Sequence, residues 1–416
     1  MTAQSIEDVA VIGAGIVGLS CAFTLQTAGR QVLVIDRQAP AQGASFGNAG
    51  AFAFSDILPL ATSGILRKLP RWLSDPLGPL SIPPAYLPTI APWLLRFWRA
   101  GWPDRITASI TAQSQLMELA RTEMAALVSA AGIGHMVRHD GSLELYESEG
   151  ELSAALPGWR HREAAGIGFE HVRGARLAEL QPGLSPAFVA GTFVPQWQTV
   201  SDPYRFALAI GEAARSRGAR FAMAEVAALV PQADGVRIEM TDGTAHHARQ
   251  VVVAGGAWSR PLTAGLGDDV PLETERGYNT TLPPGAFPLQ RQLIFGGHGF
   301  VMTPLETGIR VGGAVELGGL HLPPNFKRSE AMLAKAKRFL PGLETSGGKQ
   351  WMGFRPSLPD SLPAIGASKA SPDIVYAFGH GHLGLTQSAA TARLVAQLLA
   401  RTTTAIDLAP FSPQRF

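Results

Sequence analysis

A short segment near the start of the chain limits the fold more than any other. Four apolar residues at 9–12 are typical of a buried strand, and Gly13, Gly15 and Gly18 follow them at the G-x-G-x-x-G spacing. The first glycine allows a tight turn, the second lets the backbone approach a pyrophosphate, and the third lets a helix pack closely on the strand. The pattern predicts the first turn of a dinucleotide-binding fold.

The residues after the glycines complete that unit. An apolar run predicts a helix over 16–28 that ends at Gly29, and a second strand is expected over 31–35, followed by Asp36. The free N–H groups at the start of the helix suit phosphate oxygens, and the Asp36 carboxylate can accept hydrogen bonds from a ribose diol. A purely structural glycine turn is the alternative, but such a turn does not require a strand, a helix and an acid at these spacings.

Composition narrows the class of protein. The chain of 416 residues is long enough for two or three domains, and its 46% hydrophobic and 16% charged residues are typical of a globular protein. The formal net charge of +2 gives no reason to expect nucleic acid as a partner. The one cysteine, Cys21, excludes an internal disulfide and any cysteine cluster for a metal or an iron–sulfur centre, so no metal site is predicted.

The start of the chain does not resemble a targeting segment. Glu7 and Asp8 precede the first apolar run, where a signal peptide would carry Lys or Arg, and no apolar run reaches the roughly 18 residues of a membrane-spanning helix. We therefore expect a cytoplasmic protein. Residues 55–105 contain four tryptophans and six Lys or Arg residues, interrupted by prolines. They are either a peripheral contact with the inner membrane or a helical insertion that packs over the active site or against a partner subunit.

Patterns further along indicate a mixed α/β chain. Helices are expected over 110–131, 203–217, 329–340 and 386–399, and strands over 142–146, 191–195, 226–230, 236–240, 244–247, 251–253, 300–304, 308–315 and 374–378. The order of strand, meander, strand and glycine turn in 226–258 is typical of the second half of a flavin-type nucleotide domain. A glycine loop at 379–386 opens the last helix and offers a second helix N-terminus to an electron-rich group.

Five further motifs, taken in order after the first glycines, point to a family. They are the loop at 45–50 and the segments 251–258, 275–278, 353–356 and 379–386. Together they resemble the FAD-dependent D-amino-acid oxidase superfamily, and most of all the bacterial D-amino-acid and D-hydroxyproline dehydrogenases, over nearly the whole chain. The resemblance implies an α/β fold with a Rossmann-like FAD-binding domain, which has a central parallel sheet and a β-meander. It also implies an α+β substrate part built on an antiparallel sheet.

The resemblance implies a division of the chain and a cofactor. The expected discontinuous FAD-binding domain comprises 1–55, 201–260 and 351–416, the helical insertion 56–140, and the substrate-binding domain 141–200 and 261–350. FAD is expected to be non-covalent, because relatives that attach it use a cysteine in the C-terminal half and this chain has none there. The residues assigned to FAD are Gly13, Gly15, Ile16, Val17, Gly18, Asp36, Arg37, Ser45, Asn48, Ala49, Gly50, Val226, Ala254, Gly255, Trp258, Gly379, His380, Gly381, His382, Leu383, Gly384, Leu385 and Thr386.

Arg355 is the first candidate for substrate binding. A guanidinium binds a planar carboxylate through two parallel hydrogen bonds, and the resemblance implies this role for the arginine of the Gly-x-Arg-Pro motif. A structural ion pair is the alternative. Tyr278 is the second candidate, with a packed tyrosine as its alternative, and Asn279 stands where many relatives have His. His380 and His382 are either catalytic bases or contacts of the flavin and the backbone.

The resemblance implies oxidative deamination of a D-amino acid, with D-hydroxyproline and D-proline among the candidates. Arg355 would hold the carboxylate so that a hydride passes from Cα to flavin N5, and water would convert the resulting imino acid to a 2-oxo acid. The alternatives are an enzyme that oxidises glycine or a secondary amine such as sarcosine, an NAD(P)-dependent enzyme, and a flavoprotein without turnover. The expected partners are a small amino acid and an electron acceptor of the quinone or respiratory-chain type.

Overall fold

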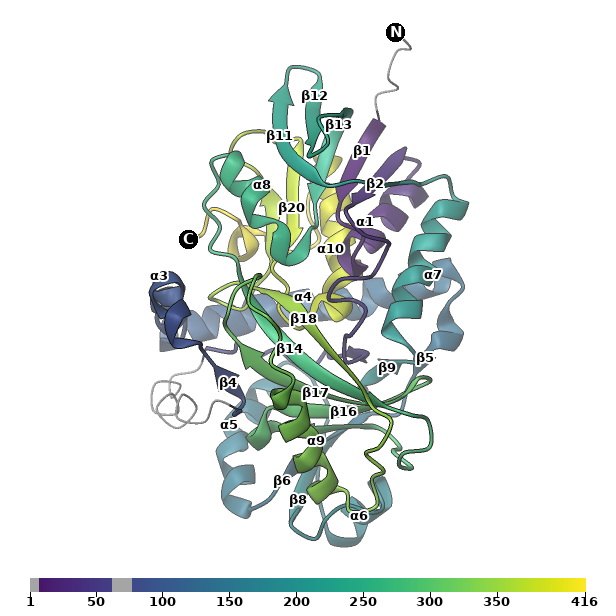
Figure 1. The fold of residues 1–416 in the computed structure, drawn as a ribbon, viewed down its shortest axis with the longest axis vertical. Helices are drawn as coiled ribbons and strands as arrows, with labels where there is room; N and C mark the ends of the chain where they lie inside the picture. The colour runs from purple at the N-terminus through teal and green to yellow at the C-terminus, as the bar shows by residue number, and fades with distance from the viewer. Residues whose placement is uncertain (1–6, 62–76) are drawn as a thin grey trace.

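The computed structural model describes residues 7–61 and 77–416, and two large sheets dominate it, one above the other in Figure 1. The upper, eight-stranded sheet has the order β10-β2-β1-β13-β12-β11, with β20 beside β13 and β19 beside β20. Its strands are β1 (Glu7–Ile12), β2 (Val32–Asp36), β10 (Arg220–Met223), β11 (Val226–Gln232), β12 (Gly235–Met240), β13 (Ala245–Val253), β19 (Ala364–Ala367) and β20 (Ile374–Phe378). The β10, β2, β1, β13 and β20 strands run parallel, and β11 to β13 form the predicted meander.

Both faces of this sheet are buried. Val9 and Val11 of β1 lie in a core shared with the helices α1 (Ile16–Thr27), α7 (Pro203–Ser216) and α10 (Gly384–Leu399). Ala10 and Ile12 lie in the core on the other face, together with apolar residues of the meander. Side chains alternate between the faces along a strand, so a continuous apolar run such as 9–12 suits a strand that is covered on both sides.

The lower, nine-stranded sheet has the order β18-β14-β17-β16-β15-β6-β8-β7, with β4 beside β17. Its strands are β4 (Leu80–Ser81), β6 (Ser142–Tyr146), β7 (Glu170–Arg173), β8 (Ala190–Val194), β14 (Glu273–Leu282), β15 (Gln292–Phe295), β16 (Phe300–Leu305), β17 (Gly308–Glu316) and β18 (Lys349–Ser357). All pairs are antiparallel except β6 with β15 and β4 with β17. The domain boundary expected at 351 falls within β18, which pairs with β14 along its whole length.

Helices and a small third sheet complete the molecule. The third sheet has the order β3 (Ala51–Phe52), β9 (Gln198–Val200) and β5 (Val137–Arg138). The remaining helices are α3 (Leu87–Ala100), α4 (Pro103–Ala131), α5 (Glu149–Ala164), α6 (Gly174–Leu180), α8 (Arg260–Gly265) and α9 (Lys327–Phe339), and the short 3-10 helices are Pro84–Tyr86, Gly134–Met136, Gly256–Trp258, Gly296–His298 and Ala409–Phe411. Among the described residues, no helix is long and apolar enough to cross a membrane.

Two elements differ from the prediction by more than a few residues or in number. The helix expected over 110–131 begins at Pro103, because a proline at the first helical position and Asp104 in the first turn favour a helix start there. The strands expected over 244–247 and 251–253 are one strand, β13. Gln250 breaks the apolar pattern between them, but its buried amide is satisfied by Leu399 O at 3.0 Å and by Arg30 at 2.8 Å.

Candidate active site

A cavity of about 710 Å³ opens between the two large sheets and collects most of the predicted site residues. Those that line it are Gly13, Gly15, Ile16, Val17, Asp36, Arg37, Ser45, Asn48, Ala49, Val226, Ala254, Gly255, Trp258, Tyr278, Arg355, His380, Gly381, His382, Gly384 and Leu385. Gly18, Gly50, Gly379, Leu383 and Thr386 do not line it. Segments from the start, middle and end of the chain therefore meet around one space.

The glycine motif forms a turn whose backbone is open to this cavity. Gly13 has a φ of 110°, and a Cβ there would collide with the backbone of Ala254. A Cβ on Gly18 would collide with the carbonyl oxygen of Gly13, so the absence of a side chain at Gly18 allows close packing of helix and turn. At Gly15 the nearest atom to a Cβ would be Ser45 Oγ at 3.6 Å, so the space over this residue is free.

Asp36 ends β2 beside the turn. Its Oδ2 accepts a hydrogen bond from the Ala14 N–H at 2.6 Å and its Oδ1 accepts one from the Gln38 N–H at 2.9 Å. Each carboxylate oxygen retains a second lone pair, which a ribose hydroxyl can use. The neighbouring Arg37 guanidinium lies 4.0 Å from the centre of the Trp258 ring, so the two side chains form a flat wall of the cavity.

The loop at 43–50 is held by its own polar side chains and by the lower sheet. Ser45 Oγ accepts a hydrogen bond from the Ile16 N–H at 2.9 Å, and Asn48 Oδ1 accepts one from the Gly50 N–H at 2.7 Å. From the sheet, Asn279 Nδ2 donates to Gly47 O at 2.9 Å. These side chains fix the course of the loop, so the groups it offers to a ligand are mainly backbone atoms.

The C-terminal glycine loop connects β20 to α10. His380 is buried and its Nε2 lies 2.9 Å from Thr391 Oγ1, while burial lowers the pKa of His380 to about 3. Thr386 Oγ1 accepts a hydrogen bond from the Ala53 N–H at 3.0 Å, and Leu383 belongs to an apolar core. Both side chains therefore serve packing between this loop and the segment after β3, and the cofactor contacts expected of Thr386 and Leu383 stay a prediction.

Arg355 lies on the cavity face of β18. It stands directly opposite Glu275 of β14, and its Nη1 donates to Ala314 O at 3.1 Å. Its Nη2 donates to Gly313 O at 3.4 Å, and burial lowers the pKa of Arg355 while the charge of Glu275 partly offsets this effect. A Cβ on Gly277 would collide with the guanidinium, so this glycine provides its space.

Tyr278 points the other way. Side chains alternate along β14, so Tyr278 faces away from the side that carries Gly277 and Arg355. Its hydroxyl donates to Glu316 Oε2 at 2.5 Å and accepts from the Asn325 N–H at 3.1 Å, and burial with Glu316 nearby raises the pKa of Tyr278 to about 12. The hydroxyl is thus occupied on the far side of β14, which favours the packed tyrosine over a contact with the substrate.

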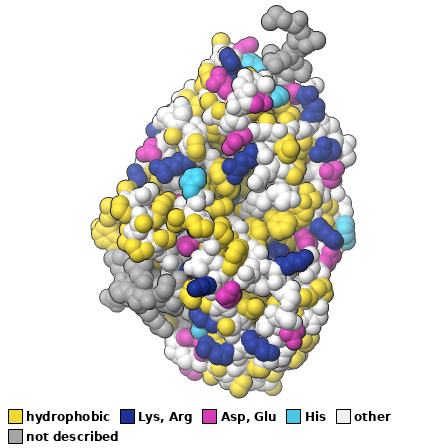
Figure 2. All heavy atoms as spheres, viewed as in Figure 1, with side chains coloured by type: hydrophobic (Ala, Val, Ile, Leu, Met, Phe, Trp, Pro, Cys, Tyr) yellow, Lys and Arg dark blue, Asp and Glu magenta, His cyan; other side chains and the backbone are white. Residues whose placement is uncertain are grey.

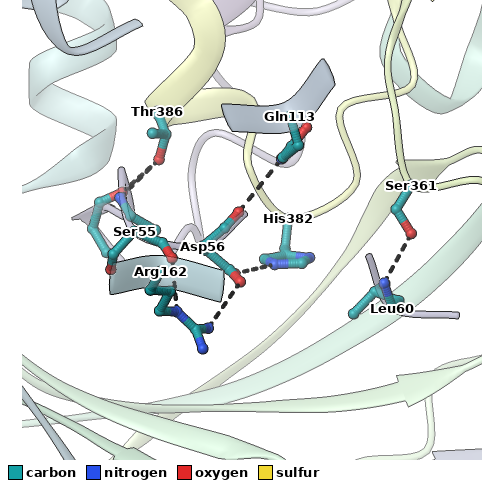
Figure 3. A network of polar contacts seen from close by, with 10 residues as sticks. Ser55, Asp56, Leu60, Gln113, Arg162, Ser361, His382 and Thr386 are labelled. Atoms are coloured by element: carbon teal, nitrogen blue, oxygen red, sulfur yellow. Dashed lines mark hydrogen bonds and ion pairs between the residues drawn. The ribbon is translucent and has the colours of Figure 1, made fainter. Parts of the chain in front are cut away.

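Figure 3 shows a network of charged and polar side chains around Asp56 that the sequence did not predict. His382 Nε2 lies 2.9 Å from Asp56 Oδ2, and Asp56 Oδ1 lies 3.9 Å from Arg162 Nη2 of α5. Arg162 also donates through Nε to Ser55 O at 2.9 Å. Asp56 and His382 both line the cavity. The two residues are 326 positions apart, so no local pattern could have paired them.

Two further polar residues line the cavity from the lower sheet. Arg310 donates through Nη1 to Asn48 O at 2.5 Å, and burial lowers its pKa to about 10. Gln292 donates to Thr303 Oγ1 at 2.9 Å, while its buried Oε1 has no partner in the described part of the chain. For both Arg310 and Gln292, the sequence signal that could have indicated a site residue was a charged or amide side chain within an otherwise apolar strand.

Comparison with known proteins decides the family. The model of the FAD-dependent oxidoreductase (DAO) family matches residues 8–398. The chain belongs to this family. It is 37% identical over 420 residues to a D-amino-acid oxidase of Bradyrhizobium diazoefficiens, covering 99% of both chains. It is 30% identical to a D-amino acid dehydrogenase of Rhizobium rhizogenes, covering 98% of this chain and 99% of that one. The glycine oxidase of Geobacillus kaustophilus shares the fold, with a TM-score of 0.76, 23% identity and 99% coverage of both chains.

The cofactor of this oxidoreductase family is FAD, and the cavity suits it. The open backbone at Gly15 lies at the N-terminus of α1, where free N–H groups favour a pyrophosphate. The N-terminus of α10, at Gly384, lines the same cavity at another point. Cys21 is buried in α1, and burial raises the pKa of its thiol to about 12, so this thiol is not available to attach a flavin.

Proposed function

We propose that this oxidoreductase oxidises the Cα–N bond of a D-amino acid, giving an imino acid that water hydrolyses to a 2-oxo acid. The relatives named D-amino-acid oxidase and D-amino acid dehydrogenase, which align along their whole length, support this proposal. The observation that carries it is Arg355, a guanidinium on the cavity wall whose hydrogen bonds within the described structure go to backbone oxygens and not to an acid.

Arg355 would act by position. Its Nη1 and Nη2 are fixed by Ala314 O and Gly313 O, and Gly277 leaves room around the guanidinium. The N–H groups that remain can hold a carboxylate in one orientation. Bound FAD supplies the hydride acceptor for the substrate Cα–H. The amine must be neutral when the hydride leaves, and the surrounding protein then needs only to accept the ammonium proton.

The test is anaerobic reduction of the purified holoenzyme by separate D- and L-amino acids. Bleaching of the flavin bands by D-amino acids, and not by their L-enantiomers, is expected. D-proline, both hydroxyproline epimers, glycine and sarcosine belong in the panel, because the same carboxylate contact fits a secondary amine. If only sarcosine or glycine reduced the flavin, the proposed substrate class would be replaced by that amine. If none of the compounds in the panel reduced the flavin, the proposed function would be contradicted.

FAD is expected to be released intact by acid or heat. The only thiol, Cys21, is buried in α1, and the sequence has no cysteine in its C-terminal half to attach the cofactor. After precipitation of the protein, chromatography of the supernatant should recover the flavin as FAD. Yellow colour that stays with the washed pellet would show a covalent bond.

We infer that α3 contacts a membrane surface and that the electron acceptor is a quinone. Four side chains in and beside this helix are 42–66% exposed: Leu87, Leu95, Trp98 and Trp102. Figure 2 shows hydrophobic atoms gathered at the edge of the molecule where Figure 1 places α3. Arg96 and Arg99 lie on the same helix, and basic residues beside apolar ones suit an anionic interface. Trp72, from the same predicted segment, lies outside the described residues.

The doubly substituted variant Leu95→Glu, Trp98→Glu should lose most of its binding to anionic vesicles, because two charges replace the exposed apolar surface of α3. Co-sedimentation with vesicles of anionic phospholipid measures this. The matched control is Met223→Glu on β10, a 78% exposed apolar side chain in another element, which should sediment like the unmodified protein. Equal sedimentation of all three proteins would exclude α3 as the contact.

A further inference from the structure

The loop that carries His382 runs directly beside the end of β18. The Gly381 N–H donates to Pro356 O at 2.7 Å, and His380 forms a β-bridge with Ser357. Arg355 precedes Pro356 and His382 follows Gly381, so this hydrogen bond brings the two cationic side chains to neighbouring points of one cavity. Their charges act on each other across it.

The His382 ring is held on its other side. Its Nε2 lies 2.9 Å from Asp56 Oδ2, and Asp56 is in turn anchored by Arg162 at 3.9 Å and by the hydrogen bond from Gln113 Nε2 to its carbonyl oxygen at 3.5 Å (Figure 3). The His382 side chain is still 38% exposed, on the cavity. Asp56 thus holds one nitrogen of the ring and leaves the rest of it accessible to a ligand.

We propose that His382 is a second cationic contact for the substrate carboxylate, beside Arg355, and that Asp56 is the positioning residue that keeps it oriented and protonated. The inference rests on the proposed function, since it concerns the same bound carboxylate. It reassigns His382 from a candidate base to a group that binds the anion in its charged form.

The charges around His382 support this assignment. The ring faces Asp56 from the segment after β3, Glu275 from β14 and Arg355 from β18. Burial opposes the imidazolium, but the hydrogen bond and charge of Asp56, aided by Glu275 and opposed by Arg355, raise the pKa of His382 above its ordinary value. Burial likewise opposes the Asp56 carboxylate, yet His382 and Arg162 hold the pKa of Asp56 low. Glu144 of β6 is the remaining acid whose charge is coupled to Asp56.

The pH dependence follows from the direction of that shift. His382 carries its charge at low pH and loses it as the pH rises through its raised pKa, so carboxylate binding should be strongest below that pKa and weaken above it. The substrate's own ammonium group also titrates at alkaline pH. Benzoate is therefore the better probe, because its planar carboxylate stays ionised from about pH 6 to about pH 10 and it has no amine.

The experiment is equilibrium dialysis of radiolabelled benzoate against the holoenzyme across this pH range. The dissociation constant should rise about tenfold for the unmodified protein as one charge-assisted hydrogen bond is lost. His382→Asn should bind weakly at every pH, and His382→Lys should bind tightly across the range because its charge persists. Asp56→Asn should shift the pH of half-maximal weakening downward, a change that a purely structural role for Asp56 would not produce.

The matched control is His298→Asn. His298 forms a similar pair with Glu147, with 2.6 Å between Nε2 and Oε2, but it does not line the cavity. This variant should keep the unmodified pH profile. An unchanged profile in His382→Asn, or no shift in Asp56→Asn, would overturn the inference. If Arg355→Ala lost benzoate binding while His382→Asn bound normally, the proposed function would stand and only the role of His382 would be refuted. Tight benzoate binding by Arg355→Ala would instead contradict the carboxylate site itself.

Discussion

Replacing Arg355 with Ala should raise the KM for the amino acid substrate by about 100- to 1,000-fold. Two charge-assisted hydrogen bonds to a carboxylate are lost, each worth about 1.5–3 kcal/mol. Lys should restore only a small part, because an ammonium cannot form two parallel bonds. Steady-state kinetics with the best substrate of the panel measures the effect, and the flavin content shows whether the fold survives.

Two comparisons sharpen that result. Gly277→Ala leaves the charge of Arg355 in place but puts a Cβ where its guanidinium lies, so its KM should rise in the same direction by a smaller factor. Arg205→Ala removes a guanidinium from α7, where it is 66% exposed and paired with Glu306, and should leave the KM unchanged. If Arg355→Ala retained the KM of the unmodified protein, carboxylate binding would have to be assigned elsewhere.

Gly15→Ala should weaken FAD binding at least about tenfold without destabilising the apoprotein. A Cβ here meets no protein atom closer than 3.6 Å, and the residue has a φ of −74°, which any amino acid adopts. The added methyl group therefore opposes only a ligand that approaches the backbone at the start of α1. Titration of apoprotein with FAD, followed by flavin fluorescence, gives the affinity, and thermal unfolding of the apoprotein gives the stability.

Variants at two other glycines of the same region serve as comparisons for Gly15→Ala. Gly29→Ala, at the far end of α1, places Ala at a φ of 80° with no atom within 4 Å of its Cβ, so it should lower the melting temperature slightly and leave FAD affinity alone. Gly18→Ala should unfold the protein at a much lower temperature, because its Cβ collides with the Gly13 carbonyl. Normal FAD affinity in Gly15→Ala would place the pyrophosphate away from this turn.

The parts of the fold that could be predicted are those with local signals. The first glycines, the apolar run after them and Asp36 lie within one strand–turn–helix–strand unit, and the structure has that unit at the centre of the upper sheet. The direction of Tyr278 could not be predicted in the same way. It depends on the register of β14 against β18, which lie far apart in the chain, and a shift of one residue would reverse which side chains face the cavity.

The charged pair of Asp56 and His382 on the cavity wall could not be predicted from the sequence for a related reason. Asp56 follows a two-residue strand and His382 lies in a glycine loop, so neither belongs to a periodic pattern. Their pairing arises only when the third sheet and α10 come together, as the hydrogen bond between Thr386 and Ala53 shows. Sequence motifs indicate which backbone segments surround a cofactor, whereas the polar partners of a substrate depend on tertiary packing.

The position of β1 has a consequence for synthesis of the protein in the cell. This first strand pairs with β13, which itself pairs with β20 near the other end of the chain, and α1 packs against α10. A ribosome must therefore synthesise the chain through β20 before the sheet beneath the turn is complete. We expect FAD to bind only after β20 has been made, and chains that terminate before β20 should reach the cell's proteases without the cofactor that would have stabilised them.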